Sequence, residues 1–301
     1  MKVLITGATG LIGSQIVKDC TKSNIKVNFL STSKTKIIRS NLVNGYYWNP
    51  KKNIIDLDCF NNIDSIISLS GTSIFKLWTT RNRKEIINSR VESLNFLRKC
   101  IIENNISIKN LVSASAIGIY PNSKEIEYSE EEKSFSNSFL AEVVNKWENA
   151  ANAFETIGVN VSIIRIGLVL SEKAGVLKQT MLPMKFGLGI VFGSGEQWQS
   201  WIHIEDISRI FLFMLEKDLS GVYNGVSKNP LTNLEFTRII SSNFSIMPYT
   251  LKIPRIFFKI LFGKMHVLFF NSHKISSRKI LDKGFSFKFA NLKDAIKDII
   301  R

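Results

Sequence analysis

The segment "KVLITGATGLIGSQIVKDC", from Lys2 to Cys20, decides the fold. Its opening run "KVLIT" is typical of a strand buried on both faces, because such strands carry nearly continuous apolar residues. The residues that follow the glycines place Leu11, Ile12 and Ile16 at helical spacing. A buried strand, a glycine-rich turn and a helix in this order predict the first unit of a nucleotide-binding α/β fold.

The turn between this strand and helix carries glycines at three-residue intervals. Glycine lets the chain turn sharply, lets backbone N–H groups approach a pyrophosphate, and lets the helix pack closely on the sheet. The helix N-terminus then offers unpaired donors and the positive end of the helix dipole to the phosphates. The predicted cofactor contacts in this loop are Gly7, Thr9, Gly10, Leu11, Ile12 and Gly13.

The second predicted strand, within "KVNFLSTSK" (Lys26 to Lys34), indicates which dinucleotide binds. A site for NAD places an Asp or Glu against the ribose 2′-hydroxyl. No acidic residue occurs between Cys20 and Ile55. Ser31, Ser33 and Lys34 instead offer hydroxyls and a cation, which suit a 2′-phosphate. We therefore expect NADP as the cofactor, with NAD as the alternative.

The alternation of strands and helices continues along the chain. Apolar strand segments near 63–71, 108–120 and 159–171 are separated by helical segments near 81–105 and 137–154. This pattern predicts an α/β fold with a doubly wound parallel sheet, whose ligands lie at the carboxyl ends of the strands. Further cofactor contacts are expected at Leu69, Ser70, Gly71, Ser89 and Ser113.

These motifs together resemble the short-chain dehydrogenase/reductase superfamily, in its extended, epimerase-like branch. "LITGATGLIG", "INSRVES", "SASAIGIY", "RIGLVLS", "GSGEQWQSWIHIEDISR" and "LDKGFSF" follow in order over nearly the whole chain. The sequence is most similar to the group called "epimerase family protein", which has a small C-terminal domain of unknown function. The resemblance implies a Rossmann fold and an NAD(P) cofactor.

In that superfamily a Ser or Thr at the end of the fifth strand acts with a Tyr and a Lys four residues apart on the next helix. The resemblance assigns the serine to Ser115, with Ser113 as the alternative. On the helix near 137–154, the Tyr and Lys positions fall on Phe139 and Val143, or on Leu140 and Val144. Neither pair can transfer a proton, so the standard mechanism does not carry over. Tyr120 is the other candidate acid.

The segment "GSGEQWQSWIHIEDISR" offers candidate substrate contacts. Gln197, Trp198 and Trp201 combine flat apolar walls with a polar anchor, as small-molecule pockets do. His203 precedes a predicted helix, and we expect a structural role for it. The three His and three Cys residues lie apart in the sequence, so no metal site is expected.

We divide the chain into residues 1–230, the NAD(P)-binding domain with a substrate-loop insertion at about 171–200, and a small, mainly helical C-terminal domain of residues 231–301. In the second domain, Thr232 is placed to cap a helix. The apolar segment 253–270 is interrupted by basic residues, which argues against a membrane span. We expect it to pack in the core, with a lid, a homodimer contact or membrane attachment as alternatives.

Composition limits the function. The formal net charge is +15, but the basic residues of the C-terminal part are scattered among apolar ones, so we expect no nucleic-acid binding. Three cysteines far apart suit a reducing cytoplasm. The sequence thus predicts an NADP-binding, epimerase-like oxidoreductase that acts on an unidentified small molecule. A catalytically silent nucleotide-binding protein, with a regulatory or redox-sensing role, is the alternative.

Overall fold

The computed structural model describes residues 1–173, 175–244 and 249–300. Eight strands form one sheet in the order β13-β8-β6-β5-β1-β2-β3-β4. Every neighbouring pair is parallel except β3 and β4. The strands are β1 (Lys2–Thr6), β2 (Lys26–Ser31), β3 (Val43–Asn49), β4 (Ile54–Ile55), β5 (Ser65–Ser68), β6 (Asn110–Ala116), β8 (Asn160–Ile166) and β13 (Gly221–Gly225). The predicted doubly wound parallel sheet is confirmed.

The strand order reverses beside β1, which pairs with β2 on one side and with β5 on the other. In open α/β sheets a ligand binds outside the carboxyl ends of the strands at this reversal. Val3, Leu4 and Ile5 of β1 are fully buried, as a strand covered on both faces requires.

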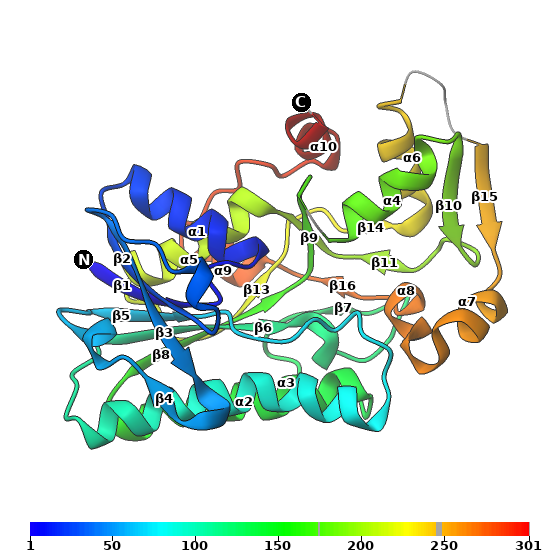
Figure 1. Cartoon of the computed structure of the whole chain (residues 1–301). Coiled ribbons are helices and arrows are strands. Elements are labelled where there is room, and N and C mark those ends of the chain that lie inside the picture. Colours follow the sequence, from blue (N-terminus) through cyan, green and yellow to red (C-terminus); the bar gives the residue numbers. More distant parts are fainter. Residues whose placement is uncertain (174, 245–248, 301) are drawn as a thin grey trace.

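Two pairs of helices cover the sheet (Figure 1). α1 (Leu11–Lys22) packs beside α5 (Ile204–Glu216) on one face, and α2 (Thr80–Glu103) packs beside α3 (Phe139–Asn152) on the other. The predicted helix near 137–154 is therefore α3. Its buried Val143, Val144 and Trp147 contribute to the interior between α3 and the sheet.

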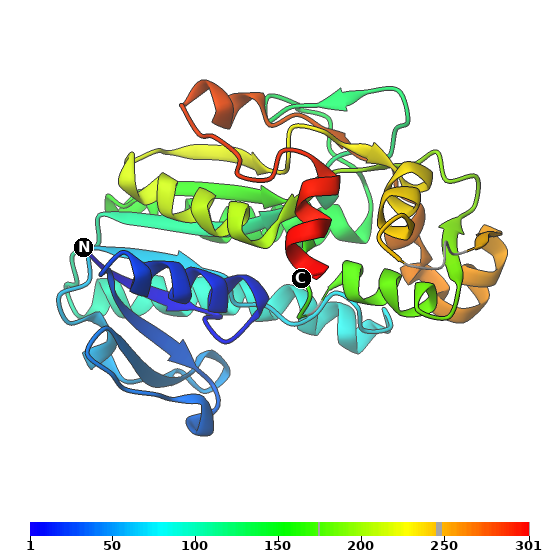
Figure 2. The ribbon, with the colours of Figure 1, turned by 90° about the horizontal axis from the view of Figure 1, so that it is seen from above.

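A second hydrophobic core lies beyond the carboxyl ends of the strands. It combines residues from both predicted domains, including Trp201, Phe236 and Ile296. Figure 2 shows α10 between the helices that cover the sheet and the α4–α6 group. The elements around this core are α4 (Val176–Met184), α6 (Asn233–Ser241), α10 (Leu292–Ile300) and the parallel pair β10 (Leu188–Phe192) and β15 (Tyr249–Ile253). Thr232 caps α6 through a reciprocal pair of hydrogen bonds with Glu235, as predicted.

Short elements connect these layers. Three further strand pairs are β9 (Leu168–Leu170) with β12 (Trp201–His203), β11 (Trp198–Gln199) with β14 (Leu231–Thr232), and β7 (Glu127–Tyr128) with β16 (Lys274–Ile275). The remaining short helices are α7 (Arg255–Phe262), α8 (Val267–Phe270) and α9 (Arg278–Asp282). Single 3₁₀ turns span Lys34–Lys36, Pro50–Lys52, Leu57–Phe60, Ile117–Ile119, Glu155–Ile157 and Gly263–His266.

α7 packs through one face only. Phe258 and Phe262 contact Phe269, with ring centroids 5.0 and 5.2 Å apart. Phe257 and Leu261, on the other face, are 55% and 71% exposed. The expectation that the whole segment packs in the core is therefore wrong for this face, because an amphipathic helix at the edge of a single chain has a partner on one side only. No helix of the described residues is long and apolar enough to span a bilayer.

Candidate functional site

The loop after β1 is shaped by its glycines. Gly7 has φ +72°, and a Cβ built there would lie 2.9 Å from the Leu69 carbonyl carbon. A Cβ at Gly13 would lie 2.3 Å from the Gly7 oxygen, so α1 could not pack on the loop. Gly10, the N-cap of α1, makes no side-chain capping bond. The first N–H groups of α1 therefore have no side-chain acceptor at the N-cap, an arrangement that suits a phosphate ligand.

A groove of about 460 Å³ opens beside this loop, at the reversal of the strand order. We call it the dinucleotide groove. Seven predicted cofactor residues line it, namely Gly7, Thr9, Ser31, Ser33, Ser70, Gly71 and Ser89. The other seven, Gly10, Leu11, Ile12, Gly13, Lys34, Leu69 and Ser113, are not among its lining residues. Of these, Leu69 supports Gly7 through its backbone, and Ser113 is fully buried and donates to the Ala114 carbonyl.

The cations of the groove differ from the expected one. Lys34 turns away, with Nζ 5.2 Å from the centre of the Tyr47 ring. Lys36 and Lys51 line the groove beside the serines instead. Lys51 follows β3, so only the pairing of β2 with β3 brings it to this site. Lys36 could have been predicted from the sequence because it is the next cation after Lys34. Nothing in the residues around Lys51 indicates that it lies at the groove.

The two predicted catalytic residues meet a buried ion pair. Ser115 Oγ donates to Glu148 Oε1 at 2.6 Å. Arg165 donates to both oxygens of Glu148 at 2.9 Å. Arg165 also donates to the Tyr120 hydroxyl at 3.0 Å, and this hydroxyl donates to Asn224 Oδ1 at 2.9 Å. The four polar partners form one buried network around Arg165.

The two charged members of this network, Glu148 and Arg165, were not predicted from the sequence. Glu148 ends the motif "FLAEVVNKWE", and Arg165 interrupts the apolar strand "SIIRIG". A charged residue within a buried strand was the available signal, because a buried charge needs a partner. Burial raises the pKa of Tyr120, although Arg165 opposes the shift. The Tyr120 hydroxyl thus stays protonated at neutral pH.

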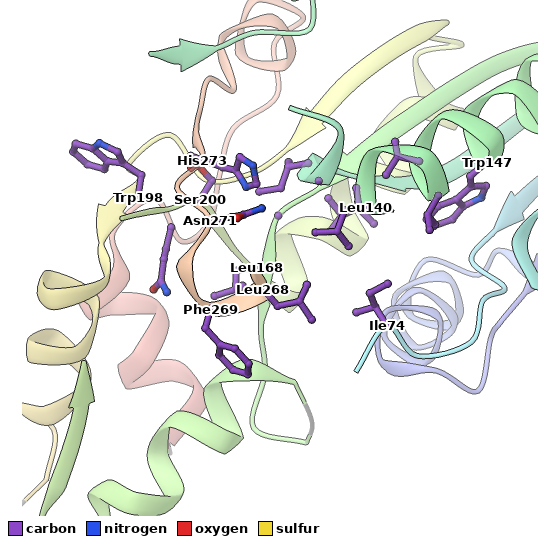
Figure 3. Close-up of a pocket in the computed structure, with 18 of the residues that line it drawn as sticks. Ile74, Leu140, Trp147, Leu168, Trp198, Ser200, Leu268, Phe269, Asn271 and His273 are labelled. Carbon is purple, nitrogen blue, oxygen red and sulfur yellow. Dashed lines mark hydrogen bonds between the residues drawn. The ribbon is translucent and has the colours of Figure 1, made fainter. Parts of the chain in front are cut away.

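A second cavity, of about 240 Å³, lies at the ends of β6 and α3 (Figure 3). We call it the chamber. Ser115 and Tyr120 are not among its lining residues, whereas Ala116 is. From α3 it receives Leu140, Val143, Val144 and Trp147. Of the two registers considered, Leu140 and Val144 both face this cavity, while Phe139 packs against Trp78.

Arg90 of α2 also lines the chamber, and no carboxylate within ion-pair distance compensates it among the described residues. Its Nη1 donates to the carbonyls of Thr72 and Ile86 at 3.1 and 2.8 Å, while Nε has no partner. Burial lowers its pKa to about 10. A Cβ at Gly71 would lie 2.9 Å from Arg90 Cζ, so the guanidinium packs where the groove and the chamber meet. Ser89 was predicted from the sequence as a cofactor contact, whereas the adjacent Arg90 was not predicted as a site residue.

The far wall of the chamber comes from β11 and from the C-terminal region. Trp198, a predicted substrate contact, lines it together with Gln199, Ser200 and His273. Burial lowers the pKa of His273 to about 4, so the ring is neutral. Its Nε2 lies 3.1 Å from the Tyr120 carbonyl oxygen and must carry the ring proton in order to donate there.

Gln197 and Trp201 lie outside the lining of the chamber. Gln197 Nε2 donates to the carbonyls of Phe192 and Phe269, and Trp201 Nε1 donates to the Asn229 carbonyl. Both side chains thus hold loops together. His203 is the N-cap of α5 and accepts from the Glu205 N–H, which fits the expected structural role. Among the described residues, no cluster of His, Cys, Asp and Glu could hold a metal ion.

Comparison with known proteins places this architecture in a family. The sequence model of the NAD dependent epimerase/dehydratase family matches residues 3–225, and a domain of unknown function, DUF1731, matches residues 253–299. The chain is 33% identical over 299 residues to epimerase family protein SA0724 of Staphylococcus aureus, covering 99% of this chain and 98% of the relative.

Solved structures agree with this match. The human epimerase family protein SDR39U1 (isoform 2), crystallised with NADPH, superposes with a TM-score of 0.85, at 26% identity over 99% of each chain. UDP-N-acetylglucosamine 4-epimerase from Bacillus cereus has a TM-score of 0.77 at 19% identity, over 99% of this chain and 98% of that one, and shares the fold alone. The resemblance seen in the sequence is confirmed: this chain belongs to the NAD dependent epimerase/dehydratase family, with a C-terminal DUF1731 domain.

Proposed function

We propose that the protein is an NADP-dependent, epimerase-like oxidoreductase that acts on a small molecule held in the chamber. The observation that carries this proposal is the meeting of the dinucleotide groove and the chamber at Gly71 and Arg90. A nicotinamide dinucleotide bound in the groove would supply hydride transfer at its nicotinamide ring. Membership of the family and the nicotinamide dinucleotides in the solved neighbours support this class of cofactor.

The groove favours the phosphorylated cofactor on chemical grounds. Ser31 and Ser33 offer hydroxyls, and Lys36 and Lys51 offer cations, where a ribose 2′-phosphate would need them. The one carboxylate in the lining, Glu92, comes from α2 rather than from the end of β2. The NADPH in the structure of the human relative supports the same choice.

Within the chamber we assign Arg90 the role of holding a ligand oxygen. Its charge and its place in the chamber wall suit a carbonyl, hydroxyl or carboxylate oxygen at the junction with the groove. We propose that Ser115 and Tyr120 act as positioning residues, since their hydroxyls bind the Glu148–Arg165 pair behind the chamber wall.

The alternative is a nucleotide-binding protein without turnover. The apolar face that α3 presents to the chamber favours it, because Leu140 and Val144 stand where a proton donor and a cation would act. Both hypotheses require the dinucleotide, so cofactor binding does not separate them. Turnover does: NADPH consumption with carbonyl compounds supports the enzyme, whereas tight NADPH binding with no consumption across a broad panel supports the silent protein.

Energy transfer from tryptophan to the dihydronicotinamide ring tests where the cofactor lies. Trp147 lines the chamber, so NADPH binding should quench its emission and sensitise emission from the reduced ring. Trp147→Phe should remove part of this transfer, and the remainder should come from Trp198, which also lines the chamber, and from Trp48 in the groove. Trp78→Phe is the matched control, because Trp78 packs against Phe139 and lines neither space. Transfer that survives Trp147→Phe unchanged would contradict the placement of the nicotinamide.

A further inference from the structure

We propose that the chamber takes an elongated, largely apolar molecule with one oxygen-bearing head, rather than a nucleotide sugar. The position of the head beside the cofactor rests on the proposed function. The apolar character of the body rests on the walls alone. In Figure 3, Leu140, Leu168, Leu268 and Phe269 point into one space, with Trp147 beside it. Walls of this kind bind ligands by burying apolar surface.

A third cavity adjoins the chamber under α7. This α7 cavity has a volume of about 260 Å³ and shares Leu168, Gln199, Leu268 and Phe269 with the chamber. Its other walls are mostly apolar and include Ile190, Phe192, Pro183 and Phe258. From these shared walls we infer one elongated apolar space, from the junction with the dinucleotide groove at Arg90 to the buried face of α7. A compact ligand would fill only one half of it.

The charges along this space argue against a diphosphate. Arg90 is the only cationic side chain lining either cavity, and no carboxylate lines them, among the described residues. A nucleotide sugar carries two negative charges at its diphosphate, which commonly bind several cationic or N–H donors. A single guanidinium at one end fits one oxygen-bearing head instead.

Unsatisfied polar atoms mark the place of that head. Among the described residues six buried side-chain nitrogens and oxygens lack a hydrogen-bond partner, and three of them belong to residues that line the chamber. These three are Arg90 Nε, Trp147 Nε1 and Gln199 Oε1. All three atoms are buried, so each can bind the head of a ligand only if its side chain turns toward the cavity, and such a turn would remove the cost of an unpaired polar atom. Arg90 and Trp147 suit a carbonyl oxygen, and Gln199 lies where the chamber joins the α7 cavity.

A displacement experiment with the whole protein and saturating NADPH tests the ligand class. The neutral dye N-phenyl-1-naphthylamine should bind at one saturable site, and decanal should displace it while UDP-glucose does not. Filling the junction with Leu268→Trp should weaken dye and decanal binding by about tenfold or more, because overpacking a fitted cavity is costly. Ile74→Trp, on the loop between β5 and α2, should act in the same direction at a second position in the chamber.

Controls separate this inference from the proposed function. Leu261→Trp, on the exposed face of α7, should leave dye binding unchanged and excludes binding at the surface. Both filled variants should keep NADPH affinity within about twofold, since neither residue lines the groove. Displacement of the dye by UDP-glucose would overturn the inference. So would an affinity for the dye that is unchanged in both Leu268→Trp and Ile74→Trp. If the protein binds the dye but not NADPH, the proposed function is refuted, whereas the inference that the chamber takes an apolar ligand is retained.

Discussion

Ser115 Oγ on β6 donates a hydrogen bond of 2.6 Å to Glu148 on α3, and Glu148 in turn binds Arg165 of the neighbouring strand. The expected catalytic serine is therefore hydrogen-bonded directly to a member of a buried ion pair. Because Ser115 and Arg165 lie opposite each other in the sheet register, Glu148 ties α3 to both strands. This geometry supports the positioning role proposed for Ser115.

Ser115→Ala should lower the free energy of unfolding by about 1.5–3 kcal/mol, the usual contribution of a hydrogen bond to a charged group. NADPH affinity should stay within about twofold, because Ser115 lines neither the groove nor the chamber. Urea unfolding and calorimetry measure the two quantities. Unchanged stability combined with abolished turnover would instead support the direct catalytic role expected from the family resemblance.

Gly7→Ala should weaken NADPH binding by about tenfold or more, since φ +72° and the contact with Leu69 both oppose a Cβ and distort the phosphate loop. Gly158→Ala is the matched control. Gly158 has φ +78° but open space around its Cβ position, far along the chain from the loop. The Gly158→Ala variant should be somewhat less stable than the wild type but should bind NADPH with the same affinity. Equal affinities for the two variants would remove the loop from the cofactor site.

Arg90→Met should leave the fold at least as stable as the wild type, and up to about 1–3 kcal/mol more stable. Burial without a counter-charge destabilises the guanidinium, as its lowered pKa shows, and an apolar side chain avoids this cost. Ligand binding in the chamber and any turnover should be lost. Arg98→Met serves as the control, because Arg98 also has an unpartnered Nε but lines neither space. A marked loss of stability on Arg90→Met would show that Arg90 is structural.

His273 should make the protein less stable as the pH falls. Burial lowers its pKa from 6.5 to about 4, so between these values the unfolded chain binds a proton that the folded one excludes. Stability is then complete above about pH 7 and falls toward pH 4, by up to about 3 kcal/mol from this group.

Carboxylates also respond to acid, so the comparison needs a matched variant. His273→Gln keeps a donor for the Tyr120 carbonyl oxygen but does not titrate. Urea unfolding at pH 7.5 and pH 5 should show a smaller loss for this variant than for the wild type. Equal losses would mean that His273 is protonated in the folded protein.

The parts of this structure that sequence reasoning predicted are local. The spacing of apolar residues and glycines from Lys2 to Cys20 indicates a strand, a turn and a helix. Thr232 and Glu235 form a helix cap within four residues. The absence of an Asp or Glu at the end of β2 can likewise be seen in a single segment of the sequence. Such features depend on backbone conformation and apolar periodicity, which neighbouring residues determine.

The parts that were missed arise from contacts between distant segments. Glu148 meets Arg165 because α3 packs over β6 and β8, and Lys51 reaches the groove through the sheet order. Trp201 looked like a pocket residue, yet its indole binds the Asn229 carbonyl in a second core. Residue type suggested the chemistry in each case, but packing decided which side chains face the cavities.

The preference between NADPH and NADH, measured by calorimetry, tests the central claim most directly. The wild type should bind NADPH more tightly, and Lys36→Ala with Lys51→Ala should abolish the preference by weakening NADPH alone. Lys34→Ala should change little, because Lys34 lies over Tyr47 outside the groove. The preference should shrink as salt is raised, as expected for exposed cations. Equal affinities in the wild type, or tighter binding of NADH, would contradict the account.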